Sequence, residues 1–501
     1  MTRAGLRRFD VTACIAALGL VALAAVFFAA TTRGIWLDEF WSQRLGDADA
    51  PFAALAAERW LSDTHPPLAN LLYRLVSATG ITSISAQRLA LNLPALFALT
   101  GASLVFARRS GVTVPVIFAG ALGLAGTVEA FADFRSYAWQ IAAIAVLFQY
   151  AVRLLSAELA TTSDHVIGAI ALFLALSLHY VTAIQISIFV VGLVVALVAA
   201  RRWREALGIL TVAAIAWAGL LASGLILLGR MQRDIDFGWI QTSTPIALFL
   251  FSFLLVTTLL SMPLVAYFAV KGARETTNRA TGRVLVGILL WTVIAGFVAL
   301  IALNMVTPII VQRYLVAWQL AVVALLAVLA EPVIAAGRWR LFATFGIAAL
   351  MVILGARQAA QTTGWNENRD RIAARVATCP ATRVYALSPW ALKAARASNS
   401  ARRETVVILD SYRKMAREKG FTVTTLDLAD RHRIDVSGAC QTLVWIEHID
   451  PSDIPDAAYI LRVGGLAPSA PVRTQLTASG SGVVLALTPL TSAQKRREMP
   501  K

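Results

Sequence analysis

Two adjacent carboxylates, Asp38 and Glu39, stand in an aromatic segment, Trp36–Trp41, directly after the first long apolar stretch of the chain. Carboxylates are costly near hydrocarbon and usually mark function there. At a membrane-surface cleft, such a group can accept a proton from an attacking hydroxyl. Because adjacent carboxylates repel, one of the two needs a cationic partner or holds a proton. The alternative is that both acids cap the next helix, whose N-terminus favours negative charge.

A second polar cluster, Asp63–Leu68, follows in the same loop and contains the sequence His65-Pro66-Pro67. Histidine can donate to a phosphate or shuttle protons. The following proline restricts His65 to an extended conformation, which would hold it in place. The alternative is a helix-breaking turn that carries a surface histidine.

A third cluster combines an acid, an arginine and a tyrosine in the segment Asp133-Phe134-Arg135-Ser136-Tyr137. The planar, always charged fork of arginine suits a phosphate, and Asp133 is close enough in sequence to orient it. The alternative is an ordinary anchor of arginine and tyrosine at the membrane edge.

Two further pairs of polar residues stand at the ends of apolar stretches: His179-Tyr180 and Arg313-Tyr314. Arg313 is predicted at an outer membrane boundary, against the preference of basic residues for the inner side. That exception makes it a candidate phosphate ligand. The alternative is a side chain that snorkels to the interface.

The spacing Asp47-Ala48-Asp49 could hold a divalent cation on a phosphate. Two acids separated by one residue are common by chance, so a metal here is possible but not favoured. We predict no metal site and no cofactor, since no zinc-ligand spacing, P-loop or dinucleotide-binding glycine pattern is convincing.

The composition defines the elements that must position these residues. Of the 501 residues, 58% are hydrophobic and only 15% charged, and the mean hydropathy is +0.68. A soluble protein of this length would need more charge to cover its surface. The net charge of +16 is spread over short loops, so we expect no nucleic-acid partner. The sequence predicts an α-helical polytopic membrane protein of about eleven spans: 11–30, 88–107, 112–129, 137–154, 165–181, 183–200, 206–229, 246–270, 284–304, 314–331 and 340–356.

The basic residues also predict the orientation of these spans. The loops assigned to the inner side hold most of them: Arg108, Arg109, Arg153, Arg201, Arg202, Arg204, Lys271, Arg274, Arg279, Arg283, Arg338 and Arg340. The short outer loops hold fewer: Arg135, Arg230, Arg233 and Arg313. We therefore expect a cytoplasmic N-terminus, a first span that is retained rather than cleaved as a signal peptide, and an outer C-terminal region.

Three segments are predicted outside the membrane. The first loop, 31–87, contains two helical stretches that suit a membrane surface, 50–60 and 68–76. The second is a polar loop, 230–245. The third is residues 357–501, where charge rises and a small α/β domain is expected. In that domain, strands are predicted at 382–387, 404–409, 442–447 and 480–487, helices at 411–419 and 453–461, and a disordered tail at 494–501.

The chain has three cysteines. Cys14 lies in the first span and is expected to be inert packing. If residues 357–501 lie in an oxidising compartment, Cys379 and Cys440 can form a disulfide. The alternative is two separate buried thiols.

Taken together, Asp38-Glu39, His65-Pro66-Pro67-Leu68, Asp133–Tyr137 and Arg313-Tyr314 resemble the pattern of GT-C glycosyltransferases that use polyprenyl-phosphate sugars. The closest resemblance is to bacterial family-39-type enzymes, which include protein O-mannosyltransferases and aminoarabinose transferases. It covers residues 1–356, the catalytic membrane domain, and leaves 357–501 as a separate periplasmic domain.

The resemblance implies an inverting transfer of a hexose or pentose from a polyprenyl-phosphate donor to an acceptor hydroxyl, outside a bacterial inner membrane. It makes Asp38, Glu39 and Asp133 the catalytic acids, although the family often has Glu at the position of Asp133. It makes Arg135 and Arg313 ligands of the leaving phosphate. The remaining substrate-binding candidates are His65, Tyr137, His179, Tyr180 and Tyr314. Enzymes of the mannosyl type generally need no metal.

A transporter or flippase of a lipid-linked sugar is the main alternative, and a non-catalytic scaffold is the third. A transporter should carry polar or broken helices near the middle of the membrane. Here the predicted spans are almost free of charge and the polar candidates gather at one boundary. This favours an enzyme, while the sugar and the nature of the acceptor, a glycolipid, a glycan or a protein, stay open.

Overall fold

The computed structural model describes residues 8–63, 65–156, 160–234, 242–306, 308, 310–361, 364–392, 399–427, 431–447, 449, 454–479 and 482–490. The chain forms two compact units. The first comprises Met1–Thr32, Leu45–Arg230 and Phe237–Ala359, and the second Arg33–Arg44, Met231–Asp236 and Ala360–Lys501. Residues 235–241 of the predicted loop 230–245 and the whole predicted tail 494–501 lie outside the described residues.

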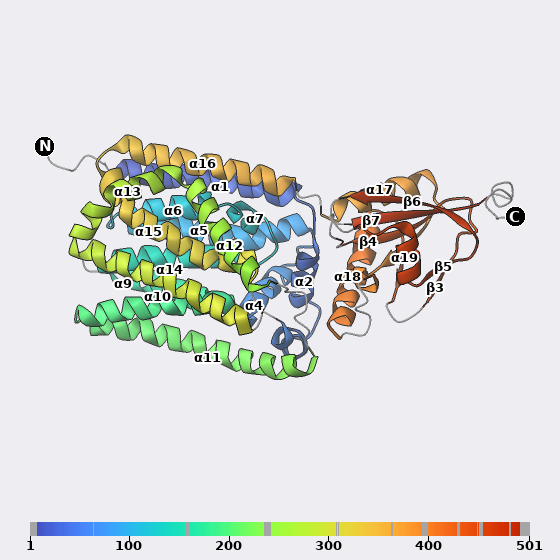
Figure 1. Cartoon of the computed structure of the whole chain (residues 1–501), viewed down its shortest axis with the longest axis horizontal. Helices are drawn as coiled ribbons and strands as arrows, with labels where there is room; N and C mark the ends of the chain where they lie inside the picture. Colours follow the sequence, from blue (N-terminus) through green and yellow to red (C-terminus); the bar gives the residue numbers. More distant parts are fainter. Residues whose placement is uncertain are drawn as a thin grey trace. The chain divides into compact units, whose positions relative to one another are not determined.

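The first unit is a bundle of apolar helices (Figure 1). Within the described residues, nine helices are long and apolar enough to cross a membrane. They are α1 (Arg8–Thr32), α5 (Ile84–Ala107), α8 (Tyr137–Leu155), α10 (Tyr180–Ala199), α11 (Trp203–Asp234), α12 (Thr244–Ser261), α14 (Ala280–Val306), α15 (Val316–Ala335) and α16 (Arg338–Ala360). Two predicted spans correspond to shorter apolar helices, α6 (Thr113–Gly123) and α9 (Thr162–Ser177). The predicted fold class, a helical polytopic membrane protein with a small α/β region, is confirmed.

Two predicted spans are interrupted. The continuous span 246–270 is wrong, because α12 ends at Ser261 and α13 (Pro263–Asn278) begins at Pro263. A proline cannot donate a backbone hydrogen bond and disfavours helix at the residue before it. The span 112–129 breaks at Gly126, whose positive φ of 86° separates α6 from the short helix α7 (Thr127–Phe131).

The part of the first loop that belongs to this unit is helical in both predicted stretches. Residues 52–62 form three short turns: α3 (Phe52–Ala54), the π-helical η1 (Leu55–Arg59) and the 3-10 turn η2 (Trp60–Ser62). Trp60 is buried, and its indole donates to the carbonyl of Leu45 at 2.7 Å. The stretch predicted at 68–76 forms α4 (Pro67–Ser77), which begins at the second of the two prolines.

The second unit contains a five-stranded sheet of order β2-β1-β4-β7-β6. Figure 1 labels three of these strands, β4, β7 and β6. Its strands are β1 (Arg383–Leu387), β2 (Thr424–Leu426), β4 (Thr442–Glu447), β6 (Val472–Ser479) and β7 (Gly482–Pro489). β1 is parallel to β2 and β4, while β7 is antiparallel to β4 and β6. A separate parallel pair joins β3 (His432–Ile434) to β5 (Leu466–Pro468). The helices are α17 (Asn366–Thr378), α18 (Asn399–Glu418) and α19 (Ala457–Val463), with the turn η4 at Pro389–Ala391.

One strand prediction in this unit is wrong. Residues 404–409 belong to the helix α18, although Val406, Val407 and Ile408 favour a strand locally. The buried positions recur through Thr405, Tyr412 and Met415 with helical spacing, which matches one buried face of a helix. Tertiary packing therefore overrides the local β propensity.

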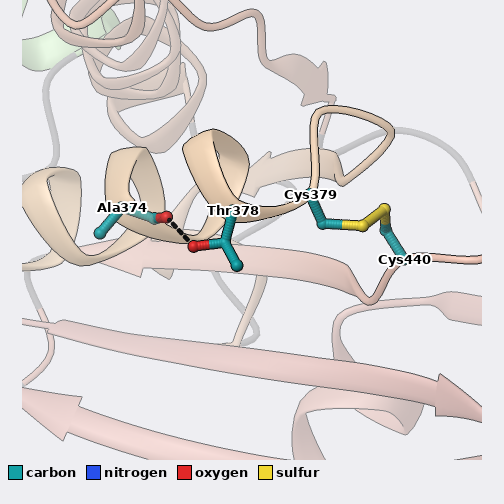
Figure 2. Close-up of a disulfide and its surroundings, with 4 residues drawn as sticks. All are labelled: Ala374, Thr378, Cys379 and Cys440. Atoms are coloured by element: carbon teal, nitrogen blue, oxygen red, sulfur yellow. Dashed lines mark hydrogen bonds between the residues drawn. A yellow bond between two sulfur atoms is a disulfide. The ribbon is translucent and has the colours of Figure 1, made fainter.

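Cys379 and Cys440 form a disulfide, with a Cα–Cα distance of 6.0 Å (Figure 2). Cys379 directly follows α17, whose last turn carries the hydrogen bond from Thr378 to the carbonyl of Ala374 at 2.9 Å. Cys440 lies two residues before β4, so the bond ties the end of α17 to the start of a central strand. Cys14 is free and buried, as expected for a packing residue.

Candidate active site

The polar residues that the first unit brings together lie where four of its helices begin. Pro66 precedes α4, Ser136 caps α8, His179 caps α10, and the turn η3 (Gln312–Leu315) leads into α15. A helix N-terminus presents unpaired N–H groups and the positive end of the helix dipole. Four such ends around one cluster make this a favourable environment for an anion.

His65 is the centre of the hydrogen bonding in this cluster. Its Nδ1 lies 3.3 Å from the carboxylate of Asp63, and its Nε2 lies 3.2 Å from Nη2 of Arg135. All three side chains are buried. Burial lowers the pKa of His65, and the neighbouring Arg135 guanidinium lowers it further, against the opposing effect of Asp63. His65 is therefore held neutral, with its Nδ1–H directed at Asp63 and its Nε2 lone pair at Arg135.

Aromatic rings pack around the two arginines. The Cζ atoms of Arg135 and Arg313 lie 5.6 and 6.0 Å from the centre of the Tyr137 ring. Guanidinium groups at these distances interact favourably with an aromatic face. Both guanidinium groups therefore lie near the same Tyr137 ring. Each can form two parallel hydrogen bonds to a phosphate.

The His179 ring lies 4.3 Å from that of Tyr314 and 5.4 Å from that of His65, measured between centroids. Among the described residues, neither the Tyr137 hydroxyl nor Nδ1 of His179 has a hydrogen-bond partner, although both are buried. An unsatisfied buried polar group costs about 1–3 kcal/mol. Both atoms therefore mark a place where a polar ligand would be stabilised.

Two residues that the sequence analysis did not select, Tyr73 and Asn92, hold the loop before α8. The Tyr73 hydroxyl accepts a hydrogen bond from the Ser136 backbone N–H at 3.1 Å. The Asn92 amide donates to the carbonyls of Phe131 and Asp133, at 3.0 and 2.6 Å. Burial raises the pKa of Tyr73, so its hydroxyl stays protonated. The sequence gives little indication of this role, because each is a single polar residue on an otherwise apolar helix face.

The remaining predicted residues have varied surroundings. The side chain of Asp133 is buried, and Asp133 belongs to the turn that Asn92 holds. The Tyr180 hydroxyl donates to Ser223 on α11 at 3.0 Å, which ties two helices together. Asp47, one of the two weak metal candidates, pairs with Arg59 at 3.0 Å. The described part of the chain contains no group of three or more His, Cys, Asp or Glu side chains that could hold a metal ion.

Asp38 and Glu39 belong to the second unit, on the helix α2 (Leu37–Leu45). Glu39 is fully buried, and its carboxylate accepts a hydrogen bond from the Trp36 backbone N–H at 3.3 Å. It thereby stabilises the start of α2, as a carboxylate in the first helical turn does. Asp38 is half-buried, and Ser42 donates to its carbonyl at 3.0 Å. The two adjacent acids therefore differ: Glu39 is used as a helix cap, and Asp38 is the more accessible.

A row of aromatic residues supports α2 within the second unit. Phe40 packs on Trp365 at 5.2 Å, Trp365 stacks on Tyr412 at 5.3 Å, and Tyr412 meets Trp445 at 4.6 Å between ring centroids. The backbone N–H of Trp365 also donates to the backbone carbonyl of Ile35 at 2.9 Å. We call Phe40, Trp365, Tyr412 and Trp445 the aromatic row.

The far end of the aromatic row rests on Glu447, which is fully buried. Its carboxylate accepts from the Trp445 indole at 2.6 Å and from Asn368 at 2.9 Å, and its N–H donates to the Tyr412 hydroxyl at 2.6 Å. Buried charges need such partners. A satisfied network of this kind makes a rigid support for the segment that carries Asp38.

The first unit is thus a helical bundle with polar residues gathered where its helices begin, and the second is a small α/β unit. Among solved structures, the chain is similar to the crystal structure of ArnT from Cupriavidus metallidurans bound to undecaprenyl phosphate. The two are 14% identical, the TM-score is 0.52, and the match covers 95% of this chain and 98% of the other. No family model matches this chain, and no curated protein matches it. The comparison confirms the GT-C fold that the sequence analysis predicted.

Proposed function

We propose that this protein is a membrane glycosyltransferase that moves a sugar from a polyprenyl-phosphate donor to an acceptor hydroxyl with inversion. The observation that carries the proposal is the cluster at four helix N-termini, in which His65, Arg135, Tyr137 and His179 are buried and Arg313 is half-buried. That cluster suits a phosphate. The structural relative with the same fold is bound to undecaprenyl phosphate, a lipid phosphate of the required class.

The reaction breaks one bond and forms another at the anomeric carbon. The acceptor O–H gives its proton to the carboxylate of Asp38, and the acceptor oxygen bonds the anomeric carbon on the face opposite the phosphate. The carbon–oxygen bond to the phosphate breaks, and its electron pair leaves with the polyprenyl phosphate. Asp38 fits the role of base better than Glu39, which caps α2.

The arginines act on the leaving group. Negative charge grows on the phosphate as the bond breaks, and Arg135 and Arg313 are placed around one ring to bind it. Preorganised charge of this kind in a site shielded from water supplies several kcal/mol of transition-state stabilisation. Asp133 and Tyr314 complete the set that we propose for donor binding. His65, held neutral, donates from Nδ1 to Asp63 and accepts at Nε2 from Arg135, so it orients the guanidinium of Arg135. No metal is required by this scheme.

The proposal also includes the side of the membrane on which the reaction takes place. Basic residues concentrate in the loops assigned to the inside, so the cluster and residues 357–501 face outward, into a bacterial periplasm. The disulfide between Cys379 and Cys440 supports an oxidising compartment for the second unit. The acceptor is then a glycolipid, glycan or protein outside the inner membrane.

The test uses purified protein, an undecaprenyl-phosphate sugar and candidate acceptors. Asp38→Asn should abolish transfer with the fold intact, because the amide cannot take the proton. Asp49→Asn is the matched control, since Asp49 is an exposed carboxylate of the same loop. Normal turnover by Asp38→Asn would remove Asp38 from catalysis.

Donor binding is tested separately. Arg313→Ala should weaken donor affinity, whereas Arg274→Ala, an exposed arginine of α13, should not. If both variants bind the donor as the wild type does, Arg313 is not a phosphate ligand. Movement of the lipid-linked sugar across vesicles without transfer to any acceptor would favour a flippase instead.

A further inference from the structure

A pocket of about 490 Å³ lies between α9 and α11, away from the candidate active site. It is lined by one face of each helix and by Tyr150 of α8: His165, Gly168, Ala169 and Leu172 on α9, and Arg204, Glu205, Gly208, Ile209 and Val212 on α11. Its volume is within the range of about 300–1,000 Å³ that is usual for ligand pockets.

Helix geometry places this pocket at the other end of the bundle. Tyr137 begins α8 in the candidate active site, whereas Tyr150 lies 13 residues further along the same helix, roughly 20 Å away at 1.5 Å per residue. α9 runs the opposite way: His165 lies near its start, beside the pocket, and His179 of the candidate active site lies two residues beyond its end. The pocket is therefore a separate site.

One end of the pocket is polar. The Tyr150 hydroxyl and Nδ1 of His165 are hydrogen-bonded at 2.8 Å. Arg204 is exposed, and no carboxylate pairs with it among the residues that the structure describes. The one carboxylate in the lining, Glu205, is held by Arg202 at 3.1 and 2.9 Å, so its charge is compensated. Since α9 and α11 both begin here, their dipoles add to the attraction for an anion.

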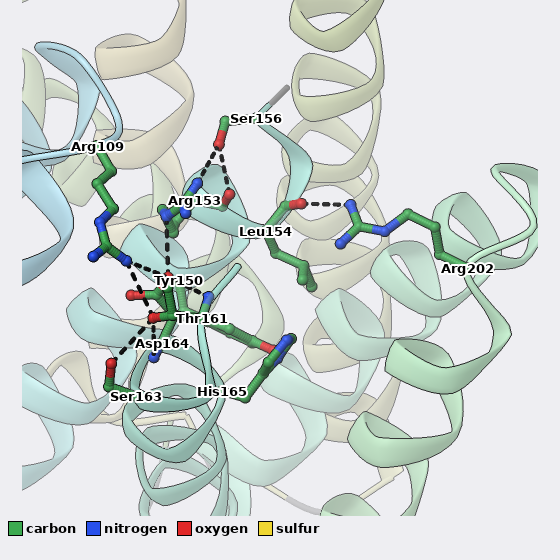
Figure 3. A network of polar contacts seen from close by, with 10 residues as sticks. All are labelled: Arg109, Tyr150, Arg153, Leu154, Ser156, Thr161, Ser163, Asp164, His165 and Arg202. Atoms are coloured by element: carbon green, nitrogen blue, oxygen red, sulfur yellow. Dashed lines mark hydrogen bonds and ion pairs between the residues drawn. The ribbon is translucent and has the colours of Figure 1, made fainter. Parts of the chain in front are cut away.

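An ion-pair network around a buried carboxylate fixes the start of α9 (Figure 3). Asp164 is fully buried and lies 3.2 Å from Nε of Arg153 and 3.6 Å from Nη1 of Arg109. It also completes a capping box with Thr161. The end of the helix that carries His165 is therefore held firmly against α8, so the polar end of the pocket is preformed.

The rest of the pocket is apolar and belongs to helices that meet the membrane. From Arg204 to Val212, α11 extends roughly 12 Å, and the walls become Leu172, Ile209 and Val212. Residues beside these walls expose large apolar side chains: Val166, Ile170, Leu207 and Leu210. Gly208 opens the slot, because a Cβ there would meet no atom within 4 Å.

We propose that this slot binds a glycerophospholipid with an anionic headgroup. The headgroup phosphate lies at Arg204 and His165, and an acyl chain follows the apolar walls. Charge complementarity at one end and a hydrocarbon wall at the other select an amphipathic anion over a soluble phosphate. This site is independent of the proposed sugar transfer.

Native mass spectrometry of the full-length protein in detergent tests the proposal, with phosphatidylglycerol and phosphatidylcholine added in separate titrations. We expect the wild type to retain phosphatidylglycerol over phosphatidylcholine, and Arg204→Gln to weaken that retention about fivefold. Gly208→Leu should fill the slot and abolish retention. Gly219→Leu, on the same helix but outside the pocket and equally open, should retain the lipid as the wild type does.

Thermal unfolding of each variant confirms that it is folded before the lipid comparison. Equal retention of phosphatidylglycerol by wild type and Gly208→Leu would overturn the proposal, as would equal retention of the two lipids by the wild type. Retention of added undecaprenyl phosphate at this pocket in place of phosphatidylglycerol would also overturn it, because the occupant would then be a lipid of another class.

Discussion

From the aromatic row we predict that packing within the second unit keeps α2, the helix that carries Asp38, folded. Trp365 is 1% exposed and contacts both Phe40 of α2 and Tyr412 of α18. Replacing it with alanine removes both ring contacts and leaves a cavity. Substitutions of this kind cost about 3–5 kcal/mol. If the whole loss lowers the free energy of local opening of α2, the fraction of molecules in which α2 is open rises roughly a hundredfold or more.

Hydrogen exchange of the backbone amides of α2 measures that opening directly, because local opening free energies determine protection. In Trp365→Ala, the amides from Phe40 to Arg44 should lose protection while those of β4 and β7 keep most of theirs. Sugar transfer should fall with the order of α2, and donor affinity should change little. Lys414 gives a second link, since its ammonium donates to Gln43 at 2.9 Å.

The matched control is Leu485→Ala, a fully buried position of the sheet core that lies outside the aromatic row. It should destabilise the whole second unit by about 2–5 kcal/mol, with α2 and the sheet losing protection together. If Trp365→Ala and Leu485→Ala gave the same pattern of exchange, or if α2 kept its protection in Trp365→Ala, the row would not be a support for α2 and the reasoning would be refuted.

Three further predictions concern the disulfide, His65 and Arg135. Cys379→Ser should lower the free energy of unfolding of the second unit by about 4 kcal/mol, since the bond closes a loop with a sequence separation of 61; a change below about 1 kcal/mol in denaturant unfolding would contradict this. The pKa of His65 is lowered in the folded protein. Below about pH 6.5 the unfolded chain therefore binds more protons than the folded chain does, and acid favours unfolding. The thermal midpoint of the wild type should therefore decrease with acid from that pH downward and His65→Gln should flatten the decrease, whereas parallel curves would exclude His65 as the cause. Arg135→Lys keeps the charge but loses the fork, so transfer should fall roughly a hundredfold, against no change in Arg274→Lys; equal rates would show that charge alone suffices.

The sequence identified the cluster residues where a charge or a histidine interrupts an apolar pattern at a helix boundary. Arg135 and Arg313 stand out for that reason, because a guanidinium near hydrocarbon is costly and short outer loops carry few of them. Their meeting around Tyr137 could not be predicted, since it depends on how helices separated by almost 180 residues pack. Tyr73 and Asn92 were missed because one hydroxyl or amide on an apolar face has no signal until its partner is known.

The same limit explains the errors in secondary structure. The run Thr405–Leu409 has the β-branched residues of a strand, but the face it must bury is set by α18 as a whole. β2, β3 and β5 have three residues each, too few to show an alternating pattern. The break at Pro263 was available from the sequence, since a proline near the middle of a long apolar run predicts a helix boundary.

The placement of Asp38 is where sequence order is least informative and the structure most changes the interpretation. Asp38 follows the first span closely, so its position along the chain groups it with the membrane helices. Its helix instead packs against residues more than 300 positions later, through Trp365 and the Gln43–Lys414 hydrogen bond. Asp38, the proposed base, is thus built into the α/β unit, whereas the proposed phosphate ligands are built into the helical bundle. Substitutions in the aromatic row should therefore alter turnover without altering donor affinity, and substitutions of Arg135 or Arg313 should alter both.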